Sequence, residues 1–322
     1  MPGPLKTSEK RVLVVGASGA IGRPLCVRLR AEGHVVFVIH RSAQSAAALR
    51  ALGVTPLSPN VFDDAEVGQA FEVARPDVVI HQLTALPKAL NPRALAKAAQ
   101  TTADLRRQTV PLFARHAARV RARFIAQSMA FVTTPQGPAV LDETAPLWLD
   151  GPRPIAKTND AIRVLEDATL EVSGLALRYG FFYGPGTWYA RGSTFARMVQ
   201  KRMMPITGSG EGRSSYIHID DAVDATVRAI ERGDSGIYNV CDDEPVSQNV
   251  WIPEVARLLG AKPPHRAPAW LAGLIGGPAA KFYGVSLRGA SNAKAKAELG
   301  ITPRSWRDGF ATEFGRTAAE AA

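Results

Sequence analysis

The sequence predicts an α/β fold, a doubly wound parallel sheet followed by a smaller C-terminal lobe. From residue 11 to residue 179, short β-branched runs alternate with longer helical patterns, which is typical of βαβ units. The runs are almost continuously apolar, as expected for strands that helices cover on both faces. After residue 180 the chain changes to turn-rich loops and helices with small strands between them. We therefore expect one domain at 1–179 and a smaller lobe at 180–322.

The elements follow in order along the chain. We expect strands at 11–15, 35–39, 54–57, 77–80, 123–127 and 175–179. The helices between them are expected at 20–31, 43–51, 64–74, 92–118 and 153–172. Asp63 is a good N-cap for the third helix, and Asn91 followed by Pro92 is a good start for the fourth. In the second lobe we expect helices near 219–232, 248–259, 268–282 and 290–299.

Composition is that of a soluble globular protein. The chain has 322 residues, of which 46% are hydrophobic and 21% charged, so it can bury a large core. No apolar run approaches the roughly 18 residues that span a bilayer, and the N-terminus lacks the apolar stretch of a signal peptide. We therefore expect a cytoplasmic protein with no membrane partner. Cys26 and Cys241 have no metal-ligand spacing, so we expect free thiols and no metal site.

The net charge of +10 raises the question of nucleic-acid binding. The densest basic stretch, residues 115–124, has no interleaved aromatic residues and matches no nucleic-acid motif. It is better interpreted as the solvated end of a helix that runs into a strand. A phosphorylated cofactor or an anionic substrate explains part of the positive charge, so we expect a small-molecule partner and no nucleic acid.

A glycine-rich loop, GASGAIG, follows the first strand directly. A strand that turns into a helix presents free N–H groups and the positive end of the helix dipole to an anion. Glycine also lets a pyrophosphate approach the backbone. Because the loop lies between a strand and a helix with more βαβ units behind it, dinucleotide binding is favoured over a structural turn. The expected contacts are Gly16, Ser18, Gly19, Ala20, Ile21 and Gly22.

The end of the second strand predicts the type of cofactor. A carboxylate there would accept hydrogen bonds from the ribose of NAD and repel the 2′-phosphate of NADP. The chain instead has His40, Arg41 and Ser42, and an arginine can bind phosphate oxygens. We therefore expect NADP, with NAD possible, and we place Arg41 and Ser42 at the cofactor.

Five motifs occur in order along the chain. They are the GxxGxxG spacing, VIHQLTAL at 79–86, LRYGFFYGPGT at 177–187, SYIHIDDAVDAT at 215–226 and GIYNVCDDEPVS at 236–247. Together they resemble the extended short-chain dehydrogenase/reductases, the NAD-dependent epimerase/dehydratase family, over about residues 11–260. The resemblance implies a Rossmann domain, a nicotinamide cofactor and oxidation or reduction at a carbonyl or hydroxyl of a small molecule. Many relatives pair through their fourth and fifth helices, so it also implies a possible homodimer.

The resemblance assigns further residues to the cofactor and the substrate. From the adenine to the nicotinamide, the implied cofactor positions are Asn60, Val61, Leu83, Thr84, Tyr179 and Phe181. Phe182 and Trp188 would belong to an apolar wall beside the substrate. Arg213 lies one residue from the position where relatives place an arginine on an anionic substrate.

The family usually carries a catalytic serine, tyrosine and lysine. The two hydroxyls hold the substrate oxygen, and the tyrosine transfers the proton. The lysine lowers the pKa of the tyrosine and holds the nicotinamide ribose. Ser128 matches the serine and Lys157 the lysine, but Arg153 stands at the tyrosine position, and all six tyrosines follow residue 178. Arginine stays protonated and cannot act as a general acid in the manner of a phenol.

Three interpretations of Arg153 stay open. The proton donor comes from elsewhere, either a water or Tyr179, Tyr183 or Tyr189, of which we assign Tyr183. Alternatively, Arg153 stabilises a developing oxyanion by its charge. In the third interpretation Lys157 matches by chance, and its helix is simply amphipathic. We expect an NADP-preferring oxidoreductase, with a non-redox isomerase, epimerase or lyase and an NADP(H)-sensing regulatory protein as the alternatives.

Overall fold

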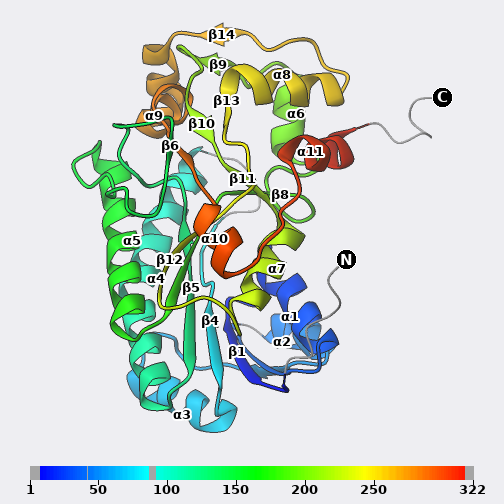
Figure 1. Ribbon diagram of the computed structural model, residues 1–322. Helices are drawn as coiled ribbons and strands as arrows, with labels where there is room; N and C mark the ends of the chain where they lie inside the picture. Colours follow the sequence, from blue (N-terminus) through cyan, green and yellow to red (C-terminus); the bar gives the residue numbers. More distant parts are fainter. Residues whose placement is uncertain (1–7, 42, 87–91, 316–322) are drawn as a thin grey trace, which may run out of the picture.

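A seven-stranded parallel sheet forms the centre of the computed structural model, which describes residues 8–41, 43–86 and 92–315 (Figure 1). The strand order is β12-β7-β5-β4-β1-β2-β3. The strands are β1 (Arg11–Val15), β2 (Val35–Ile39), β3 (Thr55–Leu57), β4 (Val78–His81), β5 (Arg123–Met129), β7 (Leu175–Tyr179) and β12 (Gly236–Val240). The chain order reverses between β1 and β4, and ligands of such sheets bind beyond the carboxyl ends of the strands at this point.

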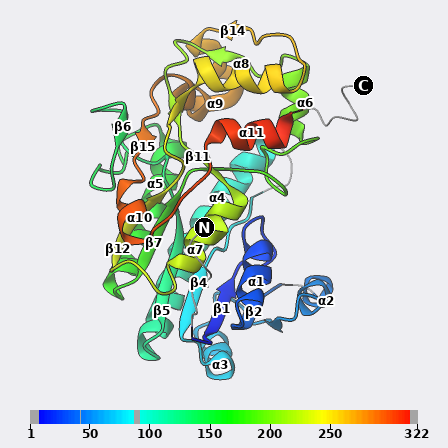
Figure 2. The ribbon, with the colours of Figure 1, turned by 45° about the vertical axis from the view of Figure 1, so that its right-hand side comes forward.

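Helices cover both faces of the sheet. Figures 1 and 2 show α1, α2 and α7 on one side and α4 and α5 on the other. The first layer consists of α1 (Gly22–Ala31), α2 (Ala43–Arg50) and α7 (Ile219–Arg228), and the second of α3 (Asp64–Ala74), α4 (Pro92–Arg119) and α5 (Arg153–Glu171). Asp63 Oδ1 accepts hydrogen bonds from the N–H groups of Ala65 and Glu66, which confirms the predicted cap of α3. Asn91 lies outside the described residues.

The second lobe follows β7 and packs around aromatic side chains. Its main helices are α6 (Thr194–Gln200), α8 (Gln248–Leu258), α9 (Ala269–Val285) and α11 (Trp306–Phe314), and α10 (Ala293–Glu298) leads back along β12. Short strand pairs connect them: β8 (Phe181–Tyr183) with β11 (Tyr216–His218), β9 (Ile206–Thr207) with β14 (Arg266–Ala267), β10 (Arg213–Ser214) with β13 (Val246–Ser247), and β6 (Val140–Leu141) with β15 (Gly289–Ala290).

The second lobe differs from its predicted helices in several places. The helix expected at 268–282 extends to Val285 and kinks at Gly277, where φ is 76°. Neither α6 nor α11 is among the helices expected from the sequence; in α11, Gly309 interrupts the apolar pattern. Throughout the described part of the chain, no helix is both long and apolar enough to cross a membrane. Cys26 and Cys241 are buried free thiols.

Candidate functional site

The glycine loop between β1 and α1 packs against the backbone at the end of β4. Gly16 has φ of +100°, and a Cβ added there would lie 2.6 Å from the carbonyl oxygen of Gln82. A Cβ on Gly22 would overlap the carbonyl oxygen of Gly16. Two of the three predicted glycines are therefore required by close contacts between backbones.

The tip of this loop is open to a ligand. Ser18, Gly19 and Ala20 are exposed, whereas Ile21 is buried beneath them. No side chain caps the start of α1, and no acidic residue lies in its first turn. The N–H groups of that turn can therefore donate to an anion. An exposed tip of small residues at the start of an uncapped helix fits the pyrophosphate of a dinucleotide.

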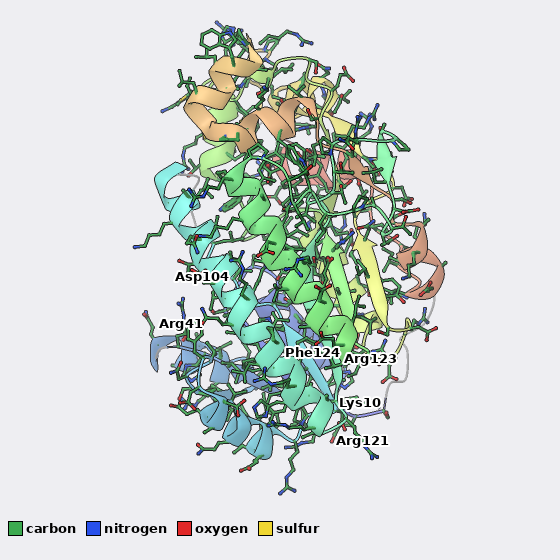
Figure 3. The ribbon with its side chains drawn as sticks, turned by 90° about the vertical axis from the view of Figure 1, so that its left-hand side faces the viewer. Lys10, Arg41, Asp104, Arg121, Arg123 and Phe124 are labelled. Carbon is green, nitrogen blue, oxygen red and sulfur yellow. The ribbon has the colours of Figure 1, made fainter. Side chains whose placement is uncertain are left out.

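The predicted adenosine contacts lie at the ends of β2 and β3. Arg41 is exposed beyond β2, and Figure 3 shows it at the surface on the side of α2. Its side chain makes no ion pair with the residues that the structure describes. Asn60 is exposed, and its Oδ1 accepts from the N–H of Phe62 (3.2 Å). Val61 is almost fully buried in the core, and Ser42 lies outside the described residues.

The segment after β4 continues from the glycine loop toward α4. Leu83 and Thr84 are half-buried, and the backbone of Leu83 lies beside Gly16. Ala85 N–H donates to the hydroxyl of Thr102 on α4 (3.0 Å), which fixes the segment to the helix. The structure therefore places Leu83 next to the glycine loop, and contact of Leu83 and Thr84 with the cofactor stays a prediction.

Ser128 belongs to a buried polar network under α5. Its hydroxyl donates to Glu166 Oε1 (2.7 Å), and Arg178 donates to both oxygens of Glu166 (2.7 Å each). The exposed fractions of the three residues are 0%, 3% and 2%. A substrate cannot reach the Ser128 hydroxyl in this arrangement. The prediction that Ser128 holds a substrate oxygen therefore finds no support in the structure.

Two further titratable groups lie in the same layer. Arg106 on α4 is buried, and burial lowers its pKa to about 10, so it remains protonated at neutral pH. Burial, together with the charge of Arg106, lowers the pKa of His81 to about 3, and the His81 ring is hydrogen-bonded to Thr109 (2.9 Å). The interior between α4, α5 and the sheet therefore contains two arginines and one carboxylate, Glu166.

Arg153 and Lys157 lie exposed on the first turns of α5. Neither side chain makes a hydrogen bond or ion pair with any described residue. The buried face of the helix instead carries Ile155 and Asn159, and Asn159 Nδ2 donates to the carbonyl oxygen of Val132 in the loop after β5 (2.9 Å). Residues two apart in a helix point roughly 200° away from each other. The structure thus turns Ile155 and Asn159 toward that loop, and Arg153 and Lys157 away from it.

The predicted tyrosines Tyr179 and Tyr183 lie in the interior. The Tyr179 hydroxyl is hydrogen-bonded to Thr226 (2.7 Å) under α7. Tyr183 is fully buried in the second lobe, where its hydroxyl packs against Gly309 and has no partner among the described residues. Burial raises the pKa of both phenols well above the ordinary value. A role for Tyr183 as proton donor therefore has no structural basis.

An aromatic wall joins the sheet domain to the second lobe. The rings of Phe131 and Phe181 stack with centroids 4.1 Å apart, and Tyr283 of α9 meets both edge-on at 6.2 and 5.8 Å. Only Phe181 was predicted. The sequence does not show that Phe131 and Tyr283 belong to this wall, because an aromatic residue in an apolar stretch is equally typical of a hydrophobic core.

The other predicted substrate residues lie apart from this wall. Phe182 is half-buried and packs on Tyr179 with ring centroids 5.3 Å apart. Trp188 is half-buried in the loop after β8. Arg213 of β10 donates to the carbonyl oxygen of Pro245 (3.3 Å). Contact of these three residues with a substrate stays a prediction.

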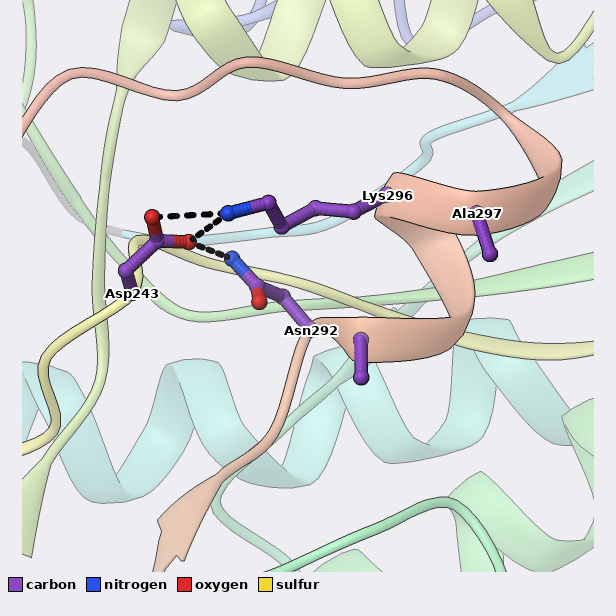
Figure 4. A pocket seen from close by; sticks show the side chains of 5 residues that line it. Asp243, Asn292, Lys296 and Ala297 are labelled. Carbon is purple, nitrogen blue, oxygen red and sulfur yellow. Dashed lines mark hydrogen bonds and ion pairs between the residues drawn. The ribbon is translucent and has the colours of Figure 1, made fainter.

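A separate shallow hollow lies between β12 and α10 (Figure 4). Asp243 receives hydrogen bonds from Lys296 Nζ (2.8 Å) and Asn292 Nδ2 (2.8 Å) across it. The hydrogen bond from Lys296, helped by the one from Asn292, holds the pKa of Asp243 below its usual range, although partial burial opposes this shift. Since the polar groups satisfy one another, we interpret this hollow as a structural contact of α10.

Comparison with known proteins agrees with this architecture. Residues 12–241 match the family described as "NAD dependent epimerase/dehydratase family". A Streptomyces protein named "3-diazoavenalumate denitrifying reductase" is 43% identical, over 94% of this chain and 100% of its own length. The dTDP-4-dehydro-6-deoxy-D-allose reductase of Streptomyces bikiniensis is 28% identical, over 78% and 81%.

Solved structures confirm the predicted doubly wound fold. The UDP-glucose 4-epimerase of Thermotoga maritima superposes with a TM-score of 0.71 at 20% identity, over 93% of this chain and 96% of that one. The dTDP-glucose 4,6-dehydratase of Streptomyces venezuelae superposes with a TM-score of 0.72 at 17% identity, over 94% and 95%. At these identities the likeness extends to the fold alone.

Proposed function

Because the chain belongs to the NAD-dependent epimerase/dehydratase family, we propose that it is an NAD(P)-dependent reductase that replaces a diazo group of a small molecule by hydrogen. The observation that carries the proposal is the 43% identity, along essentially the whole of both chains, to a protein named as a denitrifying reductase of a diazo compound. The open glycine cradle at the start of α1 supports cofactor binding.

The reaction is balanced by hydride alone. When bound, a reduced nicotinamide would supply the hydride for the new C–H bond, and the C–N bond would break with its electron pair leaving on dinitrogen. The diazo group reacts as a diazonium, so its positive charge is neutralised by the hydride. Proton transfer to a substrate oxygen is not part of this step.

The residues available fit this reaction better than they fit carbonyl reduction. Reduction of a carbonyl develops negative charge on oxygen and so benefits from a positioned proton donor. All six tyrosines follow residue 178, and the resemblance implies that Arg153 stands at the family's tyrosine position. The hydroxyls of Tyr179 and Tyr183 are buried. A reaction that expels dinitrogen does not require the missing phenol.

The aromatic wall supports an aromatic substrate. Phe131, Phe181 and Tyr283 present stacked and edge-on rings at the junction of the two lobes. A stacked or edge-on aromatic pair contributes about 0.5–1.5 kcal/mol of stabilisation beyond the burial of its apolar area. An aromatic substrate ring could form such pairs with this wall. We therefore assign to these three residues the role of holding the substrate ring at that junction.

The test is a turnover assay with NADPH or NADH and 3-diazoavenalumate, with a panel of aromatic ketones alongside. We expect enzyme-dependent loss of the reduced cofactor, release of dinitrogen, and deuterium from 4-deuterated cofactor at the carbon that carried the diazo group. A reaction without enzyme measures direct reduction by the cofactor. Reduction of a ketone with the diazo compound untouched would identify a carbonyl reductase instead. Conversion without net cofactor use would identify an isomerase or lyase.

We further propose that NADPH is preferred to NADH. Arg41 is exposed beyond β2 without an ion pair in the described part of the chain, so it is available to a 2′-phosphate. Arg41→Ala should weaken NADPH binding about tenfold or more, as expected for a charge-assisted contact, and leave NADH binding unchanged. Calorimetry of both cofactors measures the effect, with exposed Arg50→Ala on α2 as the control. Equal losses for the two cofactors would remove this role of Arg41.

A further inference from the structure

Two glutamine side chains, Gln82 and Gln127, lie at neighbouring positions at the carboxyl edge of the sheet. The parallel register pairs Val15 with His81 and His81 with Ala126. The next residue on each chain segment is Gly16, Gln82 or Gln127. These three residues therefore form a row that starts at the glycine loop.

Both side chains point to the layer of α1 and α7. Side chains alternate along a strand, and Ile80 and Ile125, two residues before each glutamine, belong to the core under that layer. The start of α1 and the glycine cradle lie in the same layer. Gln82 and Gln127 are therefore on the face of the sheet where an anion bound to the cradle would lie.

Neither carboxamide has a hydrogen-bond partner among the residues that the structure describes. Gln82 is 5% exposed, and its Oε1 is buried without a hydrogen bond to any described residue. Gln127 is half-buried, and its side chain makes no hydrogen bond with the described part of the chain. Buried amide groups are nearly always hydrogen-bonded in native proteins, so a missing partner at a ligand-binding edge points to a ligand donor.

We propose that Gln82 and Gln127 bind the nicotinamide riboside half of the cofactor. The adenosine half extends from the cradle toward the end of β2, where Arg41 lies. The other half must then extend along the row toward β5 and the aromatic wall. Its ribose hydroxyls and carboxamide offer donors and acceptors that a glutamine side chain can pair with reciprocally. The inference rests on the cofactor use in the proposed function.

Gln82→Leu tests the subsite, because leucine removes the unpaired oxygen at similar volume. We expect NADPH to bind three- to tenfold more weakly, the loss expected for a neutral hydrogen bond. Binding of 2′-phospho-ADP, which lacks the nicotinamide riboside, should not change. The melting temperature without cofactor should stay equal or rise. A purely structural role for Gln82 would instead lower that melting temperature and leave NADPH binding intact, which would overturn the proposal.

Two further variants keep the test decisive. Gln127→Leu, at a half-buried position, should reproduce the selective loss of NADPH affinity even if Gln82→Leu folds poorly. Gln69→Leu, on the exposed side of α3, should bind both ligands as the wild type does. Equal weakening of NADPH and 2′-phospho-ADP would overturn the assignment to the nicotinamide half. Wild-type protein that binds neither NADPH nor NADH would overturn the cofactor use itself.

Discussion

Glu166→Ala is expected to lower the free energy of unfolding by about 3–5 kcal/mol, because it leaves buried charge without a counter-ion. Glu166 accepts two hydrogen bonds from Arg178 and one from Ser128, all at 2.7 Å. Arg106, also buried, is attracted to the same carboxylate. Removing the carboxylate therefore isolates two buried cations. Urea unfolding at pH 7, followed by circular dichroism, measures the loss.

The neighbouring residue provides a matched control for this prediction. Asp167 is exposed on α5 and pairs only with the exposed Arg163 (3.2 Å) among the described residues. Asp167→Ala should change the free energy of unfolding by less than about 0.5 kcal/mol, as surface ion pairs do. A loss below about 1 kcal/mol for Glu166→Ala would mean that water reaches the arginines, and the network would then not be a buried one.

The sheet was predictable from the sequence because its strands are apolar on both faces. Both faces are buried only when helices cover the sheet on both sides. The apolar runs Arg11–Val15 and Val35–Ile39 have no polar face, so each needs a helix on both sides, and the structure has these strands at the predicted residues. The seventh strand was different. Gly236–Val240 lies far along the chain and joins the sheet beside β7, and local pattern does not indicate so distant a pairing.

The glycine loop was predictable from the sequence, whereas the directions of the side chains on α5 were not, for a related reason. The need for Gly16 and Gly22 is local, since it arises where a strand turns directly into a helix. The direction of a side chain on α5 depends on how the helix is rotated against the sheet. The sequence therefore does not reveal that the Arg153 side chain is exposed while that of Ile155, two residues away, is buried on the opposite side of the helix.

Ser128 is buried because of contacts with residues distant in the sequence, and its spacing from Lys157 does not reveal them. Ser128 on β5 and Arg178 on β7 are partners in register, and both face Glu166 on α5. A serine near the end of a strand is equally compatible with a substrate contact and with such a network. The tertiary pairing of the strands decides between the two.

Gly16→Ala is expected to weaken binding of the nicotinamide cofactor at least about a hundredfold. The native φ of +100° is unfavourable for an L-residue, by roughly 1–3 kcal/mol. The added Cβ would also lie 2.6 Å from Gln82 O and 2.9 Å from Leu83 N, both rigid backbone atoms, so the loop must move away from β4. The cradle that faces the pyrophosphate then loses its shape.

Thermal unfolding with and without cofactor measures this loss, using Gly33→Ala as the control. Gly33 has φ of +88°, but its Cβ would meet no atom within 4 Å, so the variant carries the backbone strain without the clash. Wild type and Gly33→Ala at 100 times the dissociation constant should both be stabilised by ~2.7 kcal/mol. Gly16→Ala should gain almost nothing at the same concentration. If Gly16→Ala is stabilised as strongly as the control, the pyrophosphate does not lie on this loop, and the cofactor binds elsewhere on the molecule.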